Sequence, residues 1–152
     1  MPRFEKASVI KARADQLFEF FLDPNNLGKI SPPSLEIIEI RATTPLTKGS
    51  QFSLKARKGR MRIDWDGRVI ELERPRLMVD EQTRGPFRRF VHIHRFRDIG
   101  DHTMLIDEVE YETRSGLLGK LANVLFIRRQ MREMFEHRHL RLKELFESGK
   151  EK

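Results

Sequence analysis

Residues 85–113 contain two runs of alternating apolar and polar residues that flank the pair Gly100 and Asp101. A Gly-Asp pair between two alternating runs predicts a β-hairpin with a two-residue loop. His94 then faces Asp107 across the hairpin, and the Cβ atoms of such facing residues lie roughly 5 Å apart. A polar pair in an apolar face requires an explanation, and a bound ligand is one candidate. A three-residue loop would instead turn one strand's side chains to the opposite face. The expected neighbours of the pair on that face are Phe90, His92, Phe96, Leu105, Val109 and Tyr111.

The remaining pattern predicts an antiparallel sheet with few helices. Asp23-Pro24 has the form of a helix start, an N-cap acid followed by proline, and Pro32-Pro33 ends that helix early. The doublet Ile37-Ile38 indicates either a bulge or a strand buried on both faces, and Gly67 indicates a bend or a bulge in its strand. Strands are expected at residues 4–11, 35–42, 51–58, 60–73, 77–83 and in both arms of the hairpin, and helices at 13–22, 24–30 and 116–148, with Gly149 just past the last helix. This is an α+β fold: a curved seven-stranded antiparallel sheet with two short helices and one long C-terminal helix.

The composition is that of one globular domain spanning residues 1–152, since 38% of the residues are hydrophobic and 35% charged. The absence of cysteine excludes a disulfide framework and a thiolate zinc site. No stretch approaches the ~20 apolar residues of a membrane span and no signal-peptide pattern is present, so we expect a soluble protein of the cytoplasm. The net charge of +7 admits nucleic acid, an anionic membrane surface or an anionic ligand as partners, although 23 acidic residues are interspersed among the basic ones.

The expected C-terminal helix has an apolar stripe, and on a helical wheel Arg128 falls in the middle of this stripe with His139 near it. Burying an unpaired arginine costs several kcal/mol. Arg128 is therefore expected either to pair with Asp107 or Asp80, or to clamp a carboxylate or a polarised carbonyl of a ligand. One helix cannot fill the space over a curved sheet, so we expect a cavity between the two, with His94 and Asp107 directed toward Arg128.

The order of these elements resembles the helix-grip fold of the START-like, or SRPBCC, superfamily. Three motifs add to the resemblance: Gly85-Pro86-Phe87 followed by His92, His94, Arg95 and Phe96; Asp23-Pro24-Asn25-Asn26-Leu27; and Leu125-Phe126-Ile127-Arg128-Arg129. They are most similar to bacterial SRPBCC ligand-binding proteins, and the superfamily also includes the birch pollen allergen, polyketide cyclases and aromatases, and coenzyme-Q-binding START proteins. The resemblance covers essentially the whole chain and implies an internal cavity for a small hydrophobic molecule such as a lipid, a quinone or a polyketide-like compound.

Binding of such a ligand, for transport or sequestration, is the function we expect from these features. Neither a cofactor nor a metal is expected, the partner is a small hydrophobic ligand rather than nucleic acid, and the protein is a monomer or a homodimer. Transient contact with a membrane surface is compatible with this function. The expected ligand-binding residues are Trp65, Gln82, Phe90, His92, His94, Phe96, Asp107, Tyr111, Arg128 and Phe135, with Asp80 also available from the neighbouring strand.

Three other functions remain open at this level. His94 and Asp107 could act as an acid–base pair in a cyclase, aromatase or dehydratase, with Tyr111 or Arg128 polarising a carbonyl. His92, His94 and Asp107 also have the composition of a two-histidine, one-carboxylate metal site. The basic residues of the last helix could follow a phosphate backbone, although glutamates interleave with them at helical spacing.

Overall fold

The computed structural model describes residues 2–114 and 120–147, and the predicted order of elements is confirmed over them. Most element boundaries lie within one or two residues of those expected. The first residues of the predicted last helix, and Gly149 beyond it, lie outside the described residues. The elements are β1 (Arg3–Ile10), α1 (Ala14–Phe21), the 3-10 helix η1 (Pro24–Asn26), α2 (Leu27–Ile30), β2 (Leu35–Ala42), β3 (Gln51–Lys58), β4 (Met61–Glu73), β5 (Leu77–Arg84), β6 (Phe87–Ile99), β7 (His102–Thr113) and α3 (Lys120–Glu147).

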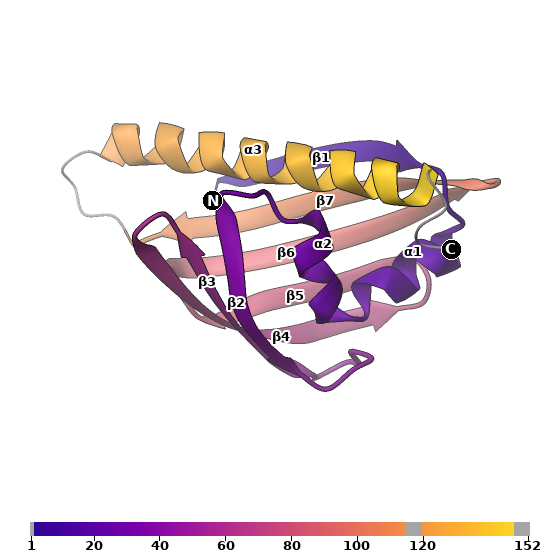
Figure 1. Cartoon of the computed structure of the whole chain (residues 1–152), viewed down its shortest axis with the longest axis horizontal. Helices are drawn as coiled ribbons and strands as arrows, with labels where there is room; N and C mark the ends of the chain where they lie inside the picture. Colours follow the sequence, from indigo (N-terminus) through magenta and orange to yellow (C-terminus); the bar gives the residue numbers. More distant parts are fainter. Residues whose placement is uncertain (1, 115–119, 148–152) are drawn as a thin grey trace.

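All seven strands form one antiparallel sheet in the order β1-β7-β6-β5-β4-β3-β2. Strands β2 to β7 therefore meander, each pairing with the next, and β1 returns to pair with β7. Figure 1 shows α3 lying along one face of the sheet near β1 and β7, while β2 and β3 curl around the space beneath it. The α1 helix packs against β6 and β7, and α2 packs against α3. No helix among residues 2–114 and 120–147 is long and apolar enough to cross a membrane.

The predicted hairpin register is confirmed. His94 pairs with Asp107 and Phe90 pairs with Tyr111 across β6 and β7. Gly100 occupies the loop with a φ of 87°, a left-handed conformation that glycine adopts without steric cost. Both predicted strand distortions are also confirmed, because the register shifts after Ile37 in β2 and before Gly67 in β4. Such bulges increase the local bend of a strand, which is consistent with the curl of the β2–β4 side.

The short second helix has two parts, η1 and α2, rather than one continuous helix. The Oδ1 atom of Asp23 accepts a hydrogen bond of 3.0 Å from the backbone nitrogen of Asn25, which confirms the predicted N-terminal cap. Pro24 follows at the first helical position. At the other end, the Ser31 hydroxyl donates to the carbonyl oxygen of Leu27, and the chain is extended at Ser31 before Pro32.

Two apolar clusters pack the helices against the sheet. The first cluster joins α1 to the C-terminal part of α3 and includes Phe18, Phe96 and Leu142. The second joins the sheet to the middle of α3 and includes Phe4 and Phe135, whose rings stack with centroids 5.5 Å apart. Aromatic contacts of this kind add to the free energy gained from burying the rings. The two clusters anchor α3 at two separate points along its length.

Gly67 provides a test of how tightly the bulged part of β4 is packed. A Cβ atom at this position would lie 2.3 Å from Cζ of Phe52, so an alanine would force the Phe52 ring to move. We expect Gly67→Ala to lower the free energy of unfolding by about 1–2 kcal/mol, as overpacking does. The matched control is Gly28→Ala, because no atom lies within 4 Å of the added Cβ at Gly28 of α2. Urea denaturation of both variants and the parent measures these changes, and a Gly67→Ala variant as stable as the parent would mean that the ring moves without cost.

Candidate ligand-binding site

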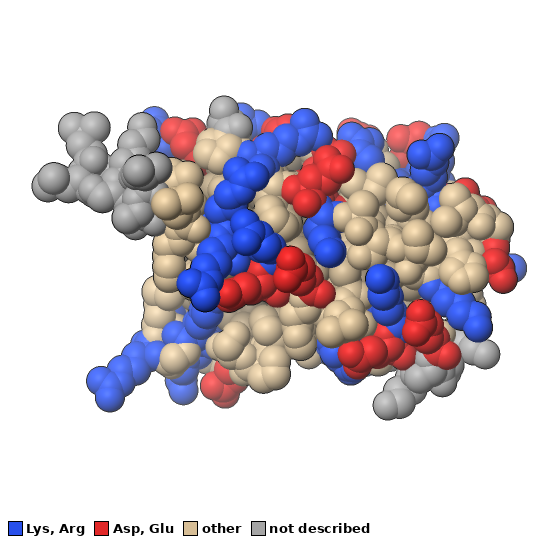
Figure 2. Space-filling view, turned by 90° about the horizontal axis from the view of Figure 1, so that it is seen from above, with Lys and Arg blue, Asp and Glu red and all other residues tan. Residues whose placement is uncertain are grey.

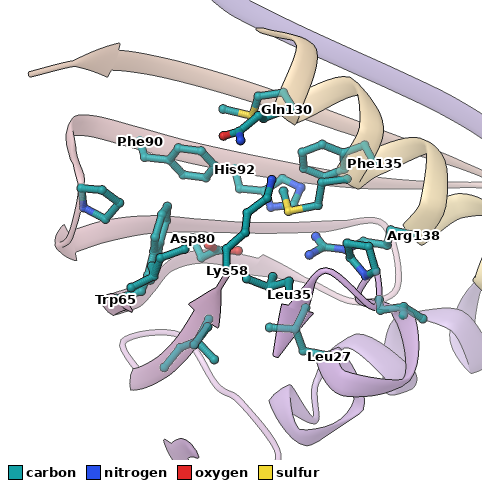
Figure 3. A pocket seen from close by; sticks show the side chains of 18 of the residues that line it. Leu27, Leu35, Lys58, Trp65, Asp80, Phe90, His92, Gln130, Phe135 and Arg138 are labelled. Carbon is teal, nitrogen blue, oxygen red and sulfur yellow. The ribbon is translucent and has the colours of Figure 1, made fainter. Parts of the chain in front are cut away.

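A cavity of about 830 Å³ lies between the sheet and the helices. Sites for small molecules typically have volumes of roughly 300–1,000 Å³ and mostly apolar walls. The side chains in this wall are largely aliphatic and aromatic and come from α1, α2, α3 and strands β2 to β6. At one end Trp65 contacts Phe90 edge to face with ring centroids 4.8 Å apart, and Figure 3 shows both residues there, with Arg138 at the other end. The cavity is therefore of a size and composition suited to a small organic molecule.

Five polar side chains from four elements form one continuous polar layer beside this cavity. They are Asp80 of β5, His92 and His94 of β6, Asp107 of β7 and His139 of α3. On β6, β7 and α3 these residues lie between the positions that contribute to the first apolar cluster and those that contribute to the second. The polar layer thus separates the two clusters and connects the sheet to α3.

Asp107 is at the centre of the polar layer and is completely buried. Its Oδ1 accepts a hydrogen bond of 2.7 Å from Nε2 of His92, and its Oδ2 accepts one of 2.6 Å from Nε2 of His139. Burial alone would raise the pKa of this carboxyl group, but His139, His92 and His94 together hold the pKa of Asp107 well below its usual value. Asp107 is therefore a carboxylate that joins β7 to both β6 and α3.

The two histidines of β6 differ in charge although their rings stack 3.7 Å apart. Burial would lower the pKa of His94, but Asp107 and Asp80 outweigh it and raise this pKa to about 9. The Nε2 of His94 lies 2.8 Å from Oδ2 of Asp80, and its Nδ1 lies 3.3 Å from Oδ1 of Asp107. Burial and the charge on His94 lower the pKa of His92, against the influence of Asp107. At neutral pH His94 is therefore protonated and His92 is neutral.

Arg138 adjoins the polar layer on α3 and lines the cavity. Its side chain is buried, and the guanidinium lies 5.1 Å from the ring centroid of Phe135 in a cation–π contact. Burial lowers the pKa of Arg138 from its ordinary value, while the negative charges of Asp107 and Asp80 oppose this change. Nε has no hydrogen-bond partner in the described part of the chain. Arg138 thus places a positive charge and unused N–H donors at the cavity wall.

Several residues predicted for the ligand site line the cavity, and others do not. The predicted residues in the wall are Trp65, Phe90, His92, His94 and Phe135, together with Asp80. Alternation along the strands could place these residues because it identifies the face of the sheet directed toward the helices.

The other predicted site residues are not part of the cavity wall, because they pack against or bond to residues that the alternation along the strands could not identify. Phe96 is buried in the first apolar cluster and Tyr111 in the second. Asp107 lies behind the two histidines and is not part of the cavity wall. The Gln82 side chain donates to the Phe87 carbonyl oxygen at 2.7 Å and accepts from the Phe87 nitrogen at 3.1 Å, so it supports the turn between β5 and β6. The predicted His94–Asp107 contact is present, but the hydrogen bonds of Asp107 go to His92 and to α3.

Arg128 requires a correction, because it is exposed and does not face His94 and Asp107. Two neighbouring side chains on the same part of α3, Leu125 and Phe126, are exposed at 61% and 56%. A helical wheel predicts the side of a helix but not which of its turns have sheet beneath them. At this part of α3 a long arginine side chain can reach solvent, and burying its charge would be costly.

Arg138 and His139 are the site residues that the sequence reasoning missed or underrated. The position of His139 near the apolar stripe was a usable signal, since a histidine there requires a polar partner. Arg138 was considered only among the basic residues of the last helix. Its guanidinium lies over the Phe135 ring at the cavity wall, a placement that depends on the tertiary structure and not on the helical pattern.

The polar layer also contains residues of metal-binding type. Ligand atoms of Asp80, His92 and His94 lie within 4.8 Å of one another. A metal ligand must present a free lone pair, so protons compete with metal for the same atoms. His94 is protonated and paired with Asp80, and Nε2 of His92 donates to Asp107. A metal ion at these atoms would have to displace the proton of His94 and the hydrogen bond from His92 to Asp107.

The polar layer predicts a specific dependence of stability on pH. The pKa of His94 is raised from 6.5 to about 9 in the folded protein. The contribution of His94 to the free energy of unfolding is therefore complete below pH 6.5 and is lost as the pH rises through about 9. We expect this contribution to the free energy of unfolding to decrease by about 2–3 kcal/mol between these limits. Urea denaturation of the parent protein and of His94→Gln at several pH values measures it as the difference between the two curves.

His102→Gln is the matched control for that comparison, since His102 is partly exposed at the tip of the hairpin beside Asp101. Its curve should follow that of the parent between pH 6.5 and 9. A His94→Gln curve parallel to the parent curve over the same range would contradict the assignment of a protonated His94.

Comparisons with known proteins agree with the geometry. The chain matches the family model described as "Polyketide cyclase / dehydrase and lipid transport" over residues 1–147. No curated protein sequence matches the chain. Among solved structures, TTHA0849 from Thermus thermophilus has a TM-score of 0.79 at 17% identity, covering 97% of this chain and 99% of that one. A START superfamily protein from Mycobacterium smegmatis has a TM-score of 0.76 at 17% identity, covering 96% and 97%.

An enzyme is also among the similar structures. The Zhui aromatase/cyclase from Streptomyces sp. R1128 has a TM-score of 0.73 at 17% identity, covering 96% of this chain and 93% of that one. Identities this low show the fold and leave activity open. The expected resemblance to the START-like superfamily and its helix-grip fold is confirmed. With a family model that matches nearly its whole length, the chain belongs to the polyketide cyclase/dehydrase and lipid transport family.

Proposed function

We propose that the protein binds a small, largely apolar molecule in the cavity between the sheet and α3, for transport or sequestration. The observation that carries this proposal is the cavity itself, about 830 Å³ of space with mostly apolar walls. Most protein interiors are packed without voids of this size. Family membership supports the same function, since the family description includes lipid transport.

The surroundings of the cavity explain why it stays open in the folded chain. Asp107 fixes α3 to the sheet through His139, and the Phe4–Phe135 contact holds the helix at a second level. The bulges of β2 and β4 lie on the opposite side of the sheet, where the strands curl around the space beneath α3 (Figure 1). A helix held over one side of the sheet, and strands that curl around the space beneath it, leave a volume that a ligand can occupy.

The mouth of the cavity is marked by residues that both line it and contact solvent. Met61, at the start of β4, is exposed at 55%, and Phe126, in the first turns of α3, is exposed at 56%. Large apolar side chains at this position provide an entry surface for a poorly soluble molecule. Transfer from a membrane surface is compatible with such a mouth.

A cavity-filling variant tests the proposal. Leu54 of β3 lines the cavity, and Leu54→Trp should occupy part of its volume. We expect the affinity for the uncharged apolar dye Nile red to fall by roughly tenfold or more, which corresponds to about 1.4 kcal/mol. Lys55→Trp is the matched control, since the next residue of β3 is directed to the opposite face. Fluorescence titration gives both dissociation constants, with circular dichroism to check folding.

Native mass spectrometry of the protein purified without denaturation gives an independent readout. A co-purified mass in the parent that is reduced in Leu54→Trp would support the proposal. Absence of both dye binding and any co-purified molecule would contradict it.

A second candidate function is acid–base catalysis of a cyclase, aromatase or dehydratase type. The observation that favours it is the protonated His94 in the cavity wall, since a positioned imidazolium can protonate a carbonyl oxygen as a bond forms at its carbon. The Nε2–H group of His94 donates a hydrogen bond to Asp80, and its Nδ1–H group lies close to the charge of Asp107. A substrate would have to displace one of these contacts.

Replacement of His94 tests this candidate with a panel of β-keto and polyketide-like substrates. If the protein is catalytic, His94→Gln should lower kcat/KM by about 100-fold or more, and activity of the parent should decrease as the pH rises through about 9. His102→Gln should leave the rate unchanged. No turnover by the parent on any substrate of the panel, or full activity in His94→Gln, would remove the catalytic function.

A further inference from the structure

Arg138 is a buried cation whose hydrogen-bonding capacity the protein does not use. Its side chain is only 8% exposed, it lines the cavity, and its Nε has no hydrogen-bond partner among the described residues. A guanidinium has five N–H donors, and leaving such donors unsatisfied in a buried place is costly. Stacking over Phe135 fixes the group against α3 but satisfies none of these donors.

The carboxylates nearest to Arg138 are already engaged. Both oxygens of Asp107 accept hydrogen bonds from histidines, and Oδ2 of Asp80 is paired with His94. These negative charges attract the guanidinium from a distance, as their effect on its pKa shows, but neither forms an ion pair with it in the described part of the chain. Arg138 therefore has electrostatic support and free donors directed at the cavity (Figure 3).

A second cation reaches the same space from the opposite wall. Lys58, the last residue of β3, lines the cavity, and Figure 3 shows its side chain extending across it toward His92 and Gln130. The described residues provide the side-chain ammonium of Lys58 with no ion pair or hydrogen bond. A bound anion would therefore find a charged partner on each side of the cavity.

The acidic residues of the cavity wall are, by contrast, all engaged with partners of their own. Asp23 caps η1 through Asn25, Asp64 pairs with Arg62, Asp80 with His94, and Glu133 with Arg129. Among the cations of the wall, Arg62 is paired with Asp64, whereas the side chains of Arg138 and Lys58 have no acidic partner among the described residues. In formal charges, the pairs Asp64–Arg62 and Glu133–Arg129 cancel, and Asp80 and Asp107 balance His94 and Arg138. Asp23 is offset by the exposed Arg114 of the wall, and Lys58 adds one positive charge. One negative charge on a ligand would make the filled site neutral.

We infer that the cavity ligand is an amphipathic organic monoanion whose carboxylate binds the guanidinium of Arg138, with Lys58 as the second cation and the apolar body extending toward Trp65 and Phe90. This inference rests on the proposed binding function and adds the chemical class of the ligand. A guanidinium matches a carboxylate with two parallel N–H···O bonds. One surplus positive charge fits a singly charged carboxylate better than a doubly charged phosphate.

Isothermal titration with matched acids and uncharged analogues tests the inference. Dodecanoate and 2-naphthoate provide an alkyl and an aryl body, and dodecanol and methyl 2-naphthoate provide the same bodies without charge. We expect the parent protein to bind at least one acid roughly tenfold more tightly than its uncharged analogue. Whichever of the two acids binds more tightly shows whether the apolar body of the ligand is alkyl or aryl. Either preference supports the inference.

Arg138→Met should remove the advantage of the acid while keeping most of the side-chain volume. We expect its affinity for the carboxylate to fall by roughly ten- to a hundredfold, and its affinity for Nile red and the uncharged analogue to change by less than about threefold. Arg132→Met is the matched control, because Arg132 is exposed on the same helix, and it should bind all ligands like the parent. Without ligand, the Tm of Arg138→Met should equal or exceed that of the parent, since an unpaired buried charge has been removed.

Other results would overturn the inference. Equal affinity of the parent for acid and uncharged analogue, or unchanged carboxylate binding by Arg138→Met, would show that Arg138 does not bind the head group, although Nile red binding would still support the cavity function. Failure of the parent to bind any apolar molecule would reject the proposed function itself. If Arg138→Met does not fold, Arg138→Lys and Lys58→Met provide the same comparison. Each of these variants must then lose more affinity for the acid than for its uncharged analogue.

Discussion

The buried carboxylate of Asp107 is the contact on which the arrangement of this fold depends. It accepts hydrogen bonds from His92 on the neighbouring strand and from His139 on α3, so one side chain joins two strands and the long helix. Removing one partner from such a buried set leaves a charge or donor unsatisfied, which destabilises the fold by several kcal/mol. Apolar packing alone can slide, but hydrogen bonds of 2.6 and 2.7 Å fix the level at which α3 lies on the sheet.

The same polar layer determines where the chain is packed and where it is open. On one side of it, Phe18, Phe96 and Leu142 form a filled apolar cluster with α1. On the other side Phe4 and Phe135 pack the helix against β1 and leave the space over β3 and β4 unfilled. The bulges of β2 and β4 lie on the side of the sheet that curls around this space. The cavity is thus a consequence of fixing a straight helix against a curved sheet.

Adjacent residues of α3 have different roles for a simple geometric reason. His139 is directed to the sheet and binds Asp107, whereas Arg138 precedes it by one position and is directed to the cavity. On the surface of α3, ion pairs such as Arg129–Glu133 and Arg141–Glu144 satisfy the charges locally, and Figure 2 shows basic and acidic side chains side by side over this face. The overall positive charge is therefore less informative about a ligand than Arg138 and Lys58 in the cavity wall.

Local pattern in the sequence determined the strands, the hairpin register and the face of the sheet that holds Phe90, His92 and His94. Alternation with a period of two and a Gly-Asp pair predicted these features residue by residue for a two-residue loop, and the structure decided between that loop and a longer one. The wheel of the last helix correctly indicated its apolar stripe but assigned the buried arginine to Arg128 rather than Arg138. Periodicity specifies which side of an element is buried, and the tertiary structure alone decides which turn meets the sheet, which turn meets solvent and which meets an unfilled cavity. The partners of Asp107 were decided in the same way, because a hydrogen bond between residues far apart in the chain depends on where α3 is placed.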